Sequence, residues 1–506
     1  MDLKEHGWAL DFLDNLYRMY LVSQFSVEEN EELRAQFETC IKFMNSQGLI
    51  KQLSFGNSVL LKPELLDYYA SALINAVNDE PDGLGSILQD RVVEGDFPIP
   101  KDNRFENKEQ ERLLLVAMIE LLQDHDIALR EYTNDGSYLV FPSLSTRELS
   151  EATELAKKEV IFSFEGPVLN IYATLAVRLS HSSFFKKKEV GKDTITFGFT
   201  NPLGNPKEIP STYGLSLHNI GEGRGELILS FNEDASNERR LLFEQFVHDH
   251  LLSRALPRTI QRIPICRRCG ESFTESAIRR RQERGFSTIK CSVCESVVSI
   301  HTQKELDPAI YQTLISAMNS AANAQREREK NITIRYGESL AKISKGEYDV
   351  FLCYNQEDED NVKKIRKELM NSGIASWDIW EIQPGKNRKR EIGKQIENMS
   401  SAAVFVGESG IGPWQYQEIE ALLEEFVRRN CSVIPVFLEN APDKLEVLPT
   451  FLRNFQEVNF RKPEHHPYSR PDIELEQEKF LKEALERGEA LQAKALESVR
   501  DSTSQM

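Results

Sequence analysis

Three short apolar segments, at residues 348–354, 402–406 and 432–438, constrain the fold of this chain more than any other feature. Each has the length of a buried strand, and the segments between them have the apolar spacing of amphipathic helices. Strand, helix and strand in alternation indicate a parallel sheet that is covered by helices. The last third of the chain therefore predicts a small doubly wound α/β domain, with its site at the carboxyl ends of the strands.

The composition is that of an ordinary globular protein, with 40% hydrophobic and 28% charged residues. A length of 506 residues predicts three or four domains. The net charge of −18 argues against a general coating of nucleic acid and favours solubility. No apolar run approaches the roughly 18 residues that a membrane span needs, and the first residues lack a signal-peptide core. We therefore expect a cytoplasmic protein that does not enter a membrane.

Four of the seven cysteines form two Cys-x-x-Cys pairs, Cys266 with Cys269 and Cys291 with Cys294, separated by 21 residues. Each pair on a tight turn can supply two corners of a tetrahedron, which suits Zn²⁺. Four thiolate ligands leave no open position, so the spacing predicts a structural zinc ribbon over residues 260–302. A redox motif is the less favoured interpretation, because two such pairs occur at ribbon spacing.

The ribbon region is also the most basic part of the chain. Nine arginines fall within 31 positions, against three glutamates. The arginines are Arg254, Arg258, Arg262, Arg267, Arg268, Arg279, Arg280, Arg281 and Arg284. Nucleic acid or an acidic protein surface could dock there, but only Phe273 and Phe286 accompany them, so stacking on single-stranded bases is not indicated. A solvated basic face that offsets the acidic remainder is the favoured alternative.

Residues 1–150 have the pattern of helices with one or two β-hairpins. An apolar stripe predicts a first helix; its members are Trp8, Phe12, Leu16 and Met19. Apolar segments on either side of the turn at 54–57 predict a hairpin, and Pro63 can begin the next helix. Residues 138–144 are expected to form a strand. Helix, helix and hairpin is the plan of a winged-helix domain.

Several of these segments resemble the COR region of Roc-COR proteins. The segments are residues 37–49, 59–66 and 136–144, followed by 167–179, 184–187 and 225–231. The resemblance implies a winged-helix, COR-like domain at 1–150 and a second α+β module at 160–255, together a scaffold for dimerisation and for a protein partner. No Gly-x-x-x-x-Gly-Lys-Ser/Thr phosphate loop occurs, so no GTPase accompanies it. An unrelated winged-helix domain remains the alternative.

Two further segments flank the C-terminal domain. Residues 303–345 are rich in Ala, Glu, Arg and Lys and have no proline after Pro308, which predicts a helical connector. Residues 463–506 open with a proline-containing break and are strongly charged, so we expect a tail in which a helix fades into disorder.

The segments of the last third resemble the sequential boxes of a TIR domain. The boxes are residues 348–354, 378–385, 414–419 and 433–437. Their order and spacing imply a flavodoxin-like TIR domain with a parallel sheet over residues 346–462. The loop at 380–385 ends in Pro384 and Gly385, a shaped but movable turn, and resembles the loop through which TIR domains pack against one another. The resemblance therefore implies self-association through this domain.

The same resemblance implies an enzyme, because many TIR domains split NAD⁺ at the bond between nicotinamide and ribose. Their required glutamate follows a tryptophan by four positions, as Glu418 follows Trp414 here. Breaking this bond develops positive charge on the ribose, which a carboxylate beneath the ring can stabilise. The two residues lie one helical turn apart and share a face. The alternative is a solvated helix glutamate, since Glu420, Glu424 and Glu425 lie close by in the sequence.

The resemblance also implies which residues line the nucleotide pocket. They are Tyr354, Asn355, Gln356, Trp380, Gln383 and Trp414. The predicted function is a signalling or antiviral defence effector that hydrolyses NAD⁺ when assembled, with the COR-like scaffold and the zinc ribbon as its sensing parts. One alternative is a non-enzymatic adaptor that acts through contacts between TIR domains. Another is an arginine-rich zinc ribbon that binds nucleic acid and recruits the TIR domain.

Overall fold

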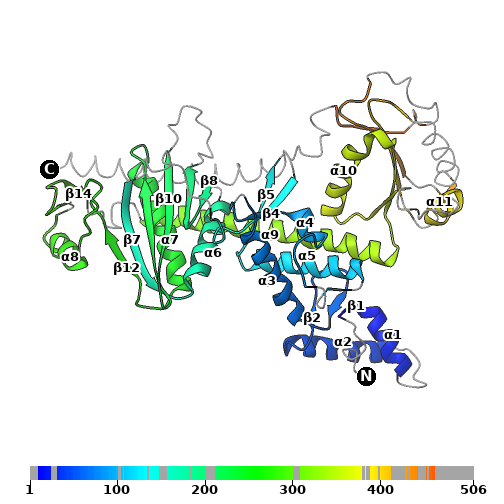
Figure 1. The fold of residues 1–506 in the computed structure, drawn as a ribbon, viewed down its shortest axis with the longest axis horizontal. Coiled ribbons are helices and arrows are strands. Elements are labelled where there is room, and N and C mark those ends of the chain that lie inside the picture. The colour runs from blue at the N-terminus through cyan, green and yellow to red at the C-terminus, as the bar shows by residue number, and fades with distance from the viewer. Residues whose placement is uncertain are drawn as a thin grey trace, which may run out of the picture. The chain divides into compact units, whose positions relative to one another are not determined.

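The computed structural model describes a large part of the chain (Figure 1). It comprises residues 9–23, 31–81, 83–100, 104–105, 107–133, 136–146, 157–182, 184–199, 211–286, 288–299, 308–378, 382, 388–396, 399, 401–411, 428–429, 432–442, 452 and 455–461. The chain divides into two compact units. The first includes residues 1–71, 93–120 and 330–471, and the second includes residues 72–92 and 121–329. The predicted tail at 463–506 lies outside the described residues.

The first strand lies where a helix was expected. β1 (Leu10–Phe12) pairs antiparallel with β3 (Ser58–Leu60), and α1 (Leu13–Ser23) begins only after β1 ends. The prediction of a helix through Phe12 is therefore wrong, because pairing with β3 supplies the backbone hydrogen bonds of this segment. Tertiary pairing has overridden a helical spacing of apolar residues. Trp8, the first member of the predicted stripe, lies outside the described residues.

The predicted hairpin is present in the first unit. β2 (Lys51–Gln52) pairs antiparallel with β3, which gives a small sheet of order β1-β3-β2. α2 (Glu31–Ser46) packs through Ile41 against the apolar residues of α1 and β3. α3 (Glu64–Asn78) begins directly after Pro63, as expected, since proline is tolerated at the start of a helix.

A second small sheet has the order β4-β6-β5. Its strands are β4 (Ser86–Leu88), β5 (Leu129–Thr133) and β6 (Gly136–Val140). Two helices lie between β4 and β5 in the sequence, α4 (Gln89–Val93) and α5 (Lys108–Asp124). The strand expected at 138–144 ends at Val140, because the chain then turns, with Leu144 N–H donating to Phe141 O at 3.0 Å. The winged-helix and COR-like assignments stay predictions.

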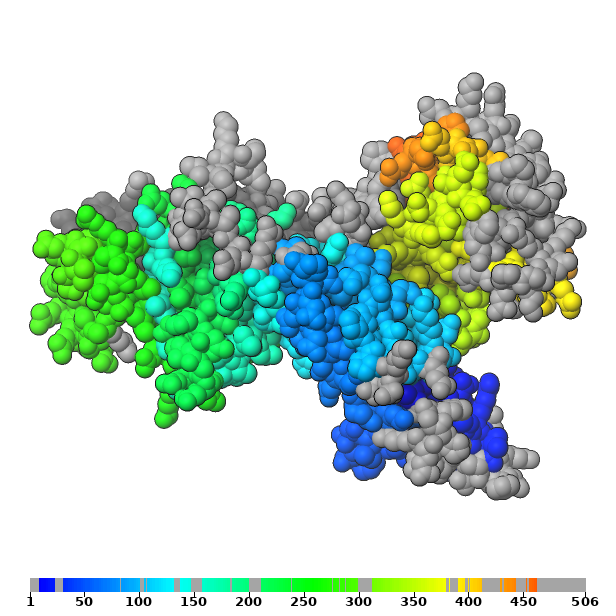
Figure 2. Space-filling model, in the orientation of Figure 1, coloured from blue at the N-terminus to red at the C-terminus, as the bar shows by residue number. Residues whose placement is uncertain are grey.

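The second unit contains a six-stranded antiparallel sheet of order β12-β7-β11-β10-β9-β8. Its strands are β7 (Lys157–Glu165), β8 (Phe185–Gly191), β9 (Thr194–Phe199), β10 (Thr212–Gly221), β11 (Arg224–Phe231) and β12 (Gln261–Pro264). Burial alternates along β11, so one face of the sheet is apolar. That face packs against α6 (Val168–His181) and α7 (Asn237–Arg254) in one core that includes Tyr172, Phe243 and Leu251. Figure 2 shows one face of the surface of this module in cyan-green to green.

A small element follows this sheet. α8 (Glu275–Glu283) precedes a two-stranded hairpin of β13 (Thr288–Lys290) and β14 (Val297–Ser299). Its core holds Cys266 and Cys291 together with Phe273, Ile278 and Ile289. A hydrophobic core this small needs a further stabilising element, such as disulfides or a structural metal.

The predicted connector is helical. α9 (Pro308–Lys345) extends over 38 residues, and residues 303–307 lie outside the described part. In the first unit its last turns contact the C-terminal domain, because Ser339 Oγ donates to Met370 O at 3.1 Å and Lys342 Nζ to Asp349 Oδ2 at 2.8 Å.

The C-terminal domain contains a parallel sheet of order β16-β15-β17-β18-β19, which confirms the predicted parallel α/β architecture. Its strands are β15 (Val350–Cys353), β16 (Ser376–Asp378), β17 (Ser401–Val406), β18 (Ser432–Phe437) and β19 (Val458–Asn459), with helices α10 (Glu359–Asn371) and α11 (Arg388–Ile396). Alternate residues of β15 face two separate cores, one with Val362 of α10 and one with Ile392 of α11. The two helices therefore cover opposite faces of the sheet (Figure 1), as a buried parallel sheet requires.

Candidate functional site

The carboxyl edge of the parallel sheet carries three of the predicted pocket residues. Tyr354, Asn355 and Gln356 follow β15, and a 3₁₀ turn (Gln356–Asp358) leads into α10. The side chain of Asn355 caps this turn by accepting from Glu357 N–H at 3.5 Å. Asn355 is half-buried and Gln356 is exposed, so both lie at the surface of the edge where a ligand of a doubly wound sheet binds.

Tyr354 has a structural environment at this edge. Its hydroxyl donates to Asp378 Oδ2 at 3.2 Å, and Arg366 Nη1 donates to the same oxygen at 3.1 Å. Burial, together with the neighbouring carboxylate of Asp378, raises the pKa of Tyr354. The phenol therefore stays protonated and joins the ends of β15 and β16.

A buried carboxyl group lies between β15 and β17. Asp358 is 3% exposed, accepts a hydrogen bond from Gly407 N–H, and has a second oxygen, Oδ2, without a hydrogen bond among the described residues. Burial raises the pKa of Asp358, and the charges of Glu357 and Glu408 add to that rise. Acidic groups therefore gather at this edge, where they can accept hydrogen bonds from sugar hydroxyls or hold a proton.

The remaining predicted residues of this site lie outside the described part of the chain. They are Trp380, Gln383, Trp414 and Glu418. The sequence did not predict the buried contact between Asp358 and Gly407. The signal available was the acidic turn after the first strand and a glycine directly after the third, neither of which reveals burial.

The four predicted zinc ligands do come together, in the second unit. Their Sγ atoms all lie within 4.8 Å of one another, with 3.5 Å between Cys266 and Cys294 and between Cys269 and Cys291. A tetrahedron with zinc–sulfur bonds of about 2.3 Å has sulfur–sulfur edges of about 3.8 Å. The four thiols therefore match the size of a zinc tetrahedron.

The backbone around the cysteines has the geometry of two metal knuckles. Gly270 N–H donates to Cys266 O at 2.9 Å, and Glu295 N–H donates to Cys291 O at 3.1 Å. Gly270 has φ +76°, a conformation that favours glycine. Burial raises the pKa of Cys266, but hydrogen bonds from Ser296 and from the backbone of Cys269 outweigh it and lower the pKa to about 6. These donors favour a thiolate at Cys266, the form that binds metal, whereas at Cys269 a backbone hydrogen bond that lowers the pKa is outweighed by burial and by hydrogen bonds among the neighbouring thiols, which raise it.

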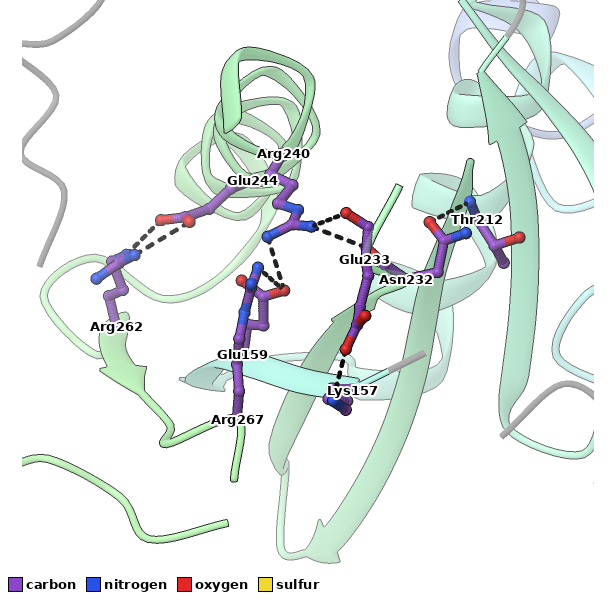
Figure 3. A network of polar contacts seen from close by, with 9 residues as sticks. All are labelled: Lys157, Glu159, Thr212, Asn232, Glu233, Arg240, Glu244, Arg262 and Arg267. Atoms are coloured by element: carbon purple, nitrogen blue, oxygen red, sulfur yellow. Dashed lines mark hydrogen bonds and ion pairs between the residues drawn. The ribbon is translucent and has the colours of Figure 1, made fainter. Parts of the chain in front are cut away.

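Several of the arginines near the ribbon take part in ion pairs rather than facing solvent freely. Figure 3 shows Glu159 of β7 between Arg240 of α7, at 3.4 Å, and Arg267 of the first knuckle. Arg262 Nη2 donates to Glu244 Oε2 at 3.0 Å. The first knuckle is thus tied to the six-stranded sheet and to α7.

Comparisons with known proteins identify the C-terminal domain. Residues 350–471 match the family model described as TIR domain. Among solved structures, the chain is similar to the TIR domain of the Toll-related receptor TRR-2 from the lower metazoan Hydra magnipapillata, at 19% identity and a TM-score of 0.21, covering 26% of this chain and 98% of that one. No curated protein matches the chain.

The chain therefore carries a TIR domain in its C-terminal region, as its sequence predicted. A TIR domain marks a signalling protein, and TIR domains generally associate with themselves or with other TIR domains. Within the described residues, no helix is long and apolar enough to cross a membrane.

Proposed function

We propose that this protein is a signalling or defence effector whose TIR domain hydrolyses NAD⁺ at the nicotinamide–ribose bond when several copies assemble. The observation that supports it most is the TIR match over residues 350–471, within which Glu418 has the predicted spacing from Trp414. The exposed carboxylates of Glu357 and Glu408 at the carboxyl edge add to this support, since they can accept hydrogen bonds from ribose hydroxyls.

In this proposal each site residue has a distinct role. The carboxylate of Glu418 stabilises the positive charge that develops on the ribose as nicotinamide leaves. Asn355 and Gln356 contact the nucleotide from the end of β15. Trp380 and Gln383 close the pocket from the loop, and Trp414 shares the helix face of Glu418. Tyr354, which is hydrogen-bonded to Asp378, contributes by holding the pocket wall in place.

The four cysteines complete the proposal as the ligands of a structural Zn²⁺. The sulfur–sulfur separations and the knuckle hydrogen bonds support this assignment. Four thiolates close the coordination shell, so the metal stabilises the ribbon and takes no part in NAD⁺ cleavage. The COR-like scaffold and the ribbon together serve as the sensing and oligomerisation parts, with a protein as the expected partner in the cytoplasm.

The second candidate is a non-enzymatic adaptor that works by contact between TIR domains. It is favoured by the internal hydrogen bonds at the carboxyl edge. Ser409 donates to Glu357, and Tyr354 donates to Asp378, so these groups already have structural partners. The family match fits either function.

Nucleic-acid binding is the third candidate. Arg262 and Arg267 form ion pairs, whereas Arg258, Arg268, Arg279, Arg280 and Arg284 are exposed and make up the surface that could bind it. Binding to DNA or RNA through these residues would weaken steeply with salt. Binding that is absent at low salt would exclude this candidate.

The direct test of the proposed function is nicotinamide release by the purified full-length protein. NAD⁺ is added with and without a crowding agent, because assembly is expected to complete the pocket. Release that depends on protein concentration more steeply than linearly supports an assembled enzyme. If no assembling condition gives release, the adaptor function replaces the enzymatic one.

A further inference from the structure

Three arginines surround one buried carboxyl group in the second unit. Asp126, between α5 and β5, is 2% exposed. Its Oδ2 atom lies 3.5 Å from Arg254 Nη2 at the end of α7 and 3.5 Å from Arg326 Nη1 on α9. Arg178 of α6 also acts on Asp126 electrostatically. Segments far apart in the sequence thus bring their charges to one place.

The positive charges in this cluster outnumber the negative ones. Arg254 and Arg326 lie beside the single carboxylate of Asp126, and Arg178, whose Nη2 donates to Asn319 Oδ1 at 2.9 Å, acts on it electrostatically. Glu329, a further buried acid on α9, is engaged elsewhere: His181 Nε2 lies 3.0 Å from its Oε1 atom, and Arg130 N–H donates to its Oε2 at 3.2 Å. The excess is about two positive charges, and low local polarity makes such an excess costly.

The hydrogen bonding within the cluster is also incomplete. Asp126 Oδ2 and Arg326 Nε are buried, and neither makes a hydrogen bond among the described residues. Separations of 3.5 Å exceed the roughly 2.7–2.9 Å of a direct charge-assisted bond. Burial and the repulsion of Arg254 and Arg326 lower the pKa of Arg178, against the opposing effect of Asp126. In a complete ion-pair network the charged groups would be joined by direct hydrogen bonds of about 2.7–2.9 Å, and none of their buried atoms would lack a partner.

We propose that Arg178, Arg254 and Arg326 form a binding site for the phosphate group of a small anionic ligand. Guanidinium groups match the tetrahedral oxygens of phosphate in charge and geometry. The side chains of Arg254 and Arg326 are 31% and 28% exposed, so a small anion can reach them from solvent. Asp126 acts as the internal competitor that holds the arginines together in the free protein.

This site has a direct consequence for the connector. Arg326 belongs to α9, whereas Arg178 and Arg254 belong to the two helices that cover the six-stranded sheet. The first part of α9 already packs on that sheet through Ile315 and Met318, and a phosphate that bridges the three arginines would strengthen this attachment. The ligand is thus placed to report its presence to the helix that leads to the TIR domain in the sequence.

The test measures binding of inorganic phosphate, pyrophosphate and ATP to the full-length protein by calorimetry and thermal unfolding, with sodium chloride at matched ionic strength as reference. A ligand that binds only the folded state raises the melting temperature. Pyrophosphate or ATP binding more tightly than phosphate identifies a nucleotide or polyphosphate ligand. Equal affinities identify free phosphate.

Two variants should change the affinity for phosphate in opposite directions. Arg326→Gln removes one guanidinium and should weaken binding by at least about tenfold, which corresponds to about 1.4 kcal/mol. Asp126→Asn removes the competing negative charge and should strengthen binding by a similar factor, while unfolding at a lower temperature without phosphate. A purely structural network predicts the same loss of stability but no gain in phosphate affinity.

Arg224→Gln, at the exposed start of β11, is the matched control, since it removes the same charge elsewhere. Its phosphate affinity should equal that of the wild type. The proposal is overturned if wild type and Asp126→Asn bind none of the three anions beyond the chloride reference. It is overturned equally if Arg326→Gln and Arg224→Gln lower the affinity by the same factor. Arg326→Lys keeps the positive charge but replaces the planar guanidinium with an ammonium group. Its phosphate affinity shows whether the two-pronged hydrogen bonding of arginine is required.

Discussion

A Cβ atom added at Gly407 would lie 1.8 Å from Oδ1 of Asp358. Gly407 follows β17, and Asp358 ends the 3₁₀ turn after β15, so this close approach joins two neighbouring strands at the carboxyl edge. The backbone N–H of Gly407 donates to the Asp358 carboxylate. A glycine is required here by the space around its Cα rather than by its backbone angles.

The first prediction is that Gly407→Ala destabilises the TIR domain. The added methyl group must displace a buried carboxylate, and overpacking of this kind costs about 1–3 kcal/mol. Urea unfolding of the full-length protein measures the change. Gly393→Ala in α11 is the control, because a Cβ there meets nothing within 4 Å. It should be neutral or stabilising by up to about 1 kcal/mol, since alanine favours helix. Equal effects of the two substitutions would contradict the contact.

The second prediction concerns the pH dependence of stability. The pKa of Asp358 is raised in the folded state, mainly by burial. The folded state therefore binds the proton more tightly than the unfolded state, and this residue's contribution to stability is lost as pH rises from the ordinary aspartate range through the raised value.

Asp358→Asn tests this sign directly. The amide keeps an oxygen for the Gly407 N–H and has no charge to desolvate. The variant should be more stable than the wild type at about pH 7, and the difference should shrink as pH falls to about 4. Urea midpoints at several pH values give the comparison. A difference that grows toward acid pH would show that the Asp358 pKa is lowered rather than raised.

The third prediction concerns the ribbon. The purified protein should contain about one zinc per chain. Cys291→Ser should lose the metal, and the region around α8 should then unfold, because the small core there includes the ligands. Metal analysis and limited proteolysis measure both effects. Cys40→Ser, at an exposed free cysteine outside the cluster, should keep full zinc content. Freshly reduced wild-type protein without zinc would remove the ribbon assignment.

The fourth prediction concerns the connector within the first unit. A Cβ at Gly337 of α9 would lie 2.5 Å from Cγ of the buried Phe55 ring. Gly337→Ala should therefore destabilise the protein even though alanine is the better helix former. Combining it with Phe55→Leu should give less loss than the sum of the two single changes. Strict additivity in urea unfolding would show that the contact does not matter.

The parallel sheet could be predicted from the sequence because its strands are buried on both faces. Each strand reads as a continuous apolar run, and the runs are separated by helical spacing. The zinc cluster could be predicted because its four ligands lie in two short pairs, each fixed by local turns. Both patterns are formed by residues that lie close together in the sequence.

Other features could not be predicted because they depend on tertiary contacts. The spacing from Trp8 to Met19 fits a helix, yet β1 forms because β3 lies beside it. Asp358 sits in an acidic turn that reads as solvated, and only the approach of Gly407 buries it. The arginines around Asp126 come from three helices far apart in the sequence, so no local pattern marks them.

The central claim is that Glu418 performs the chemistry of an assembled TIR domain. The most direct measurement is the rate of nicotinamide release by Glu418→Ala protein beside Glu420→Ala. The control removes the same charge two positions along, on the other side of the predicted helix. Light scattering must show that all three proteins assemble equally. We expect a loss of about 10²–10³-fold for Glu418→Ala and a near wild-type rate for Glu420→Ala. Release by assembled Glu418→Ala protein at the wild-type rate would contradict the claim.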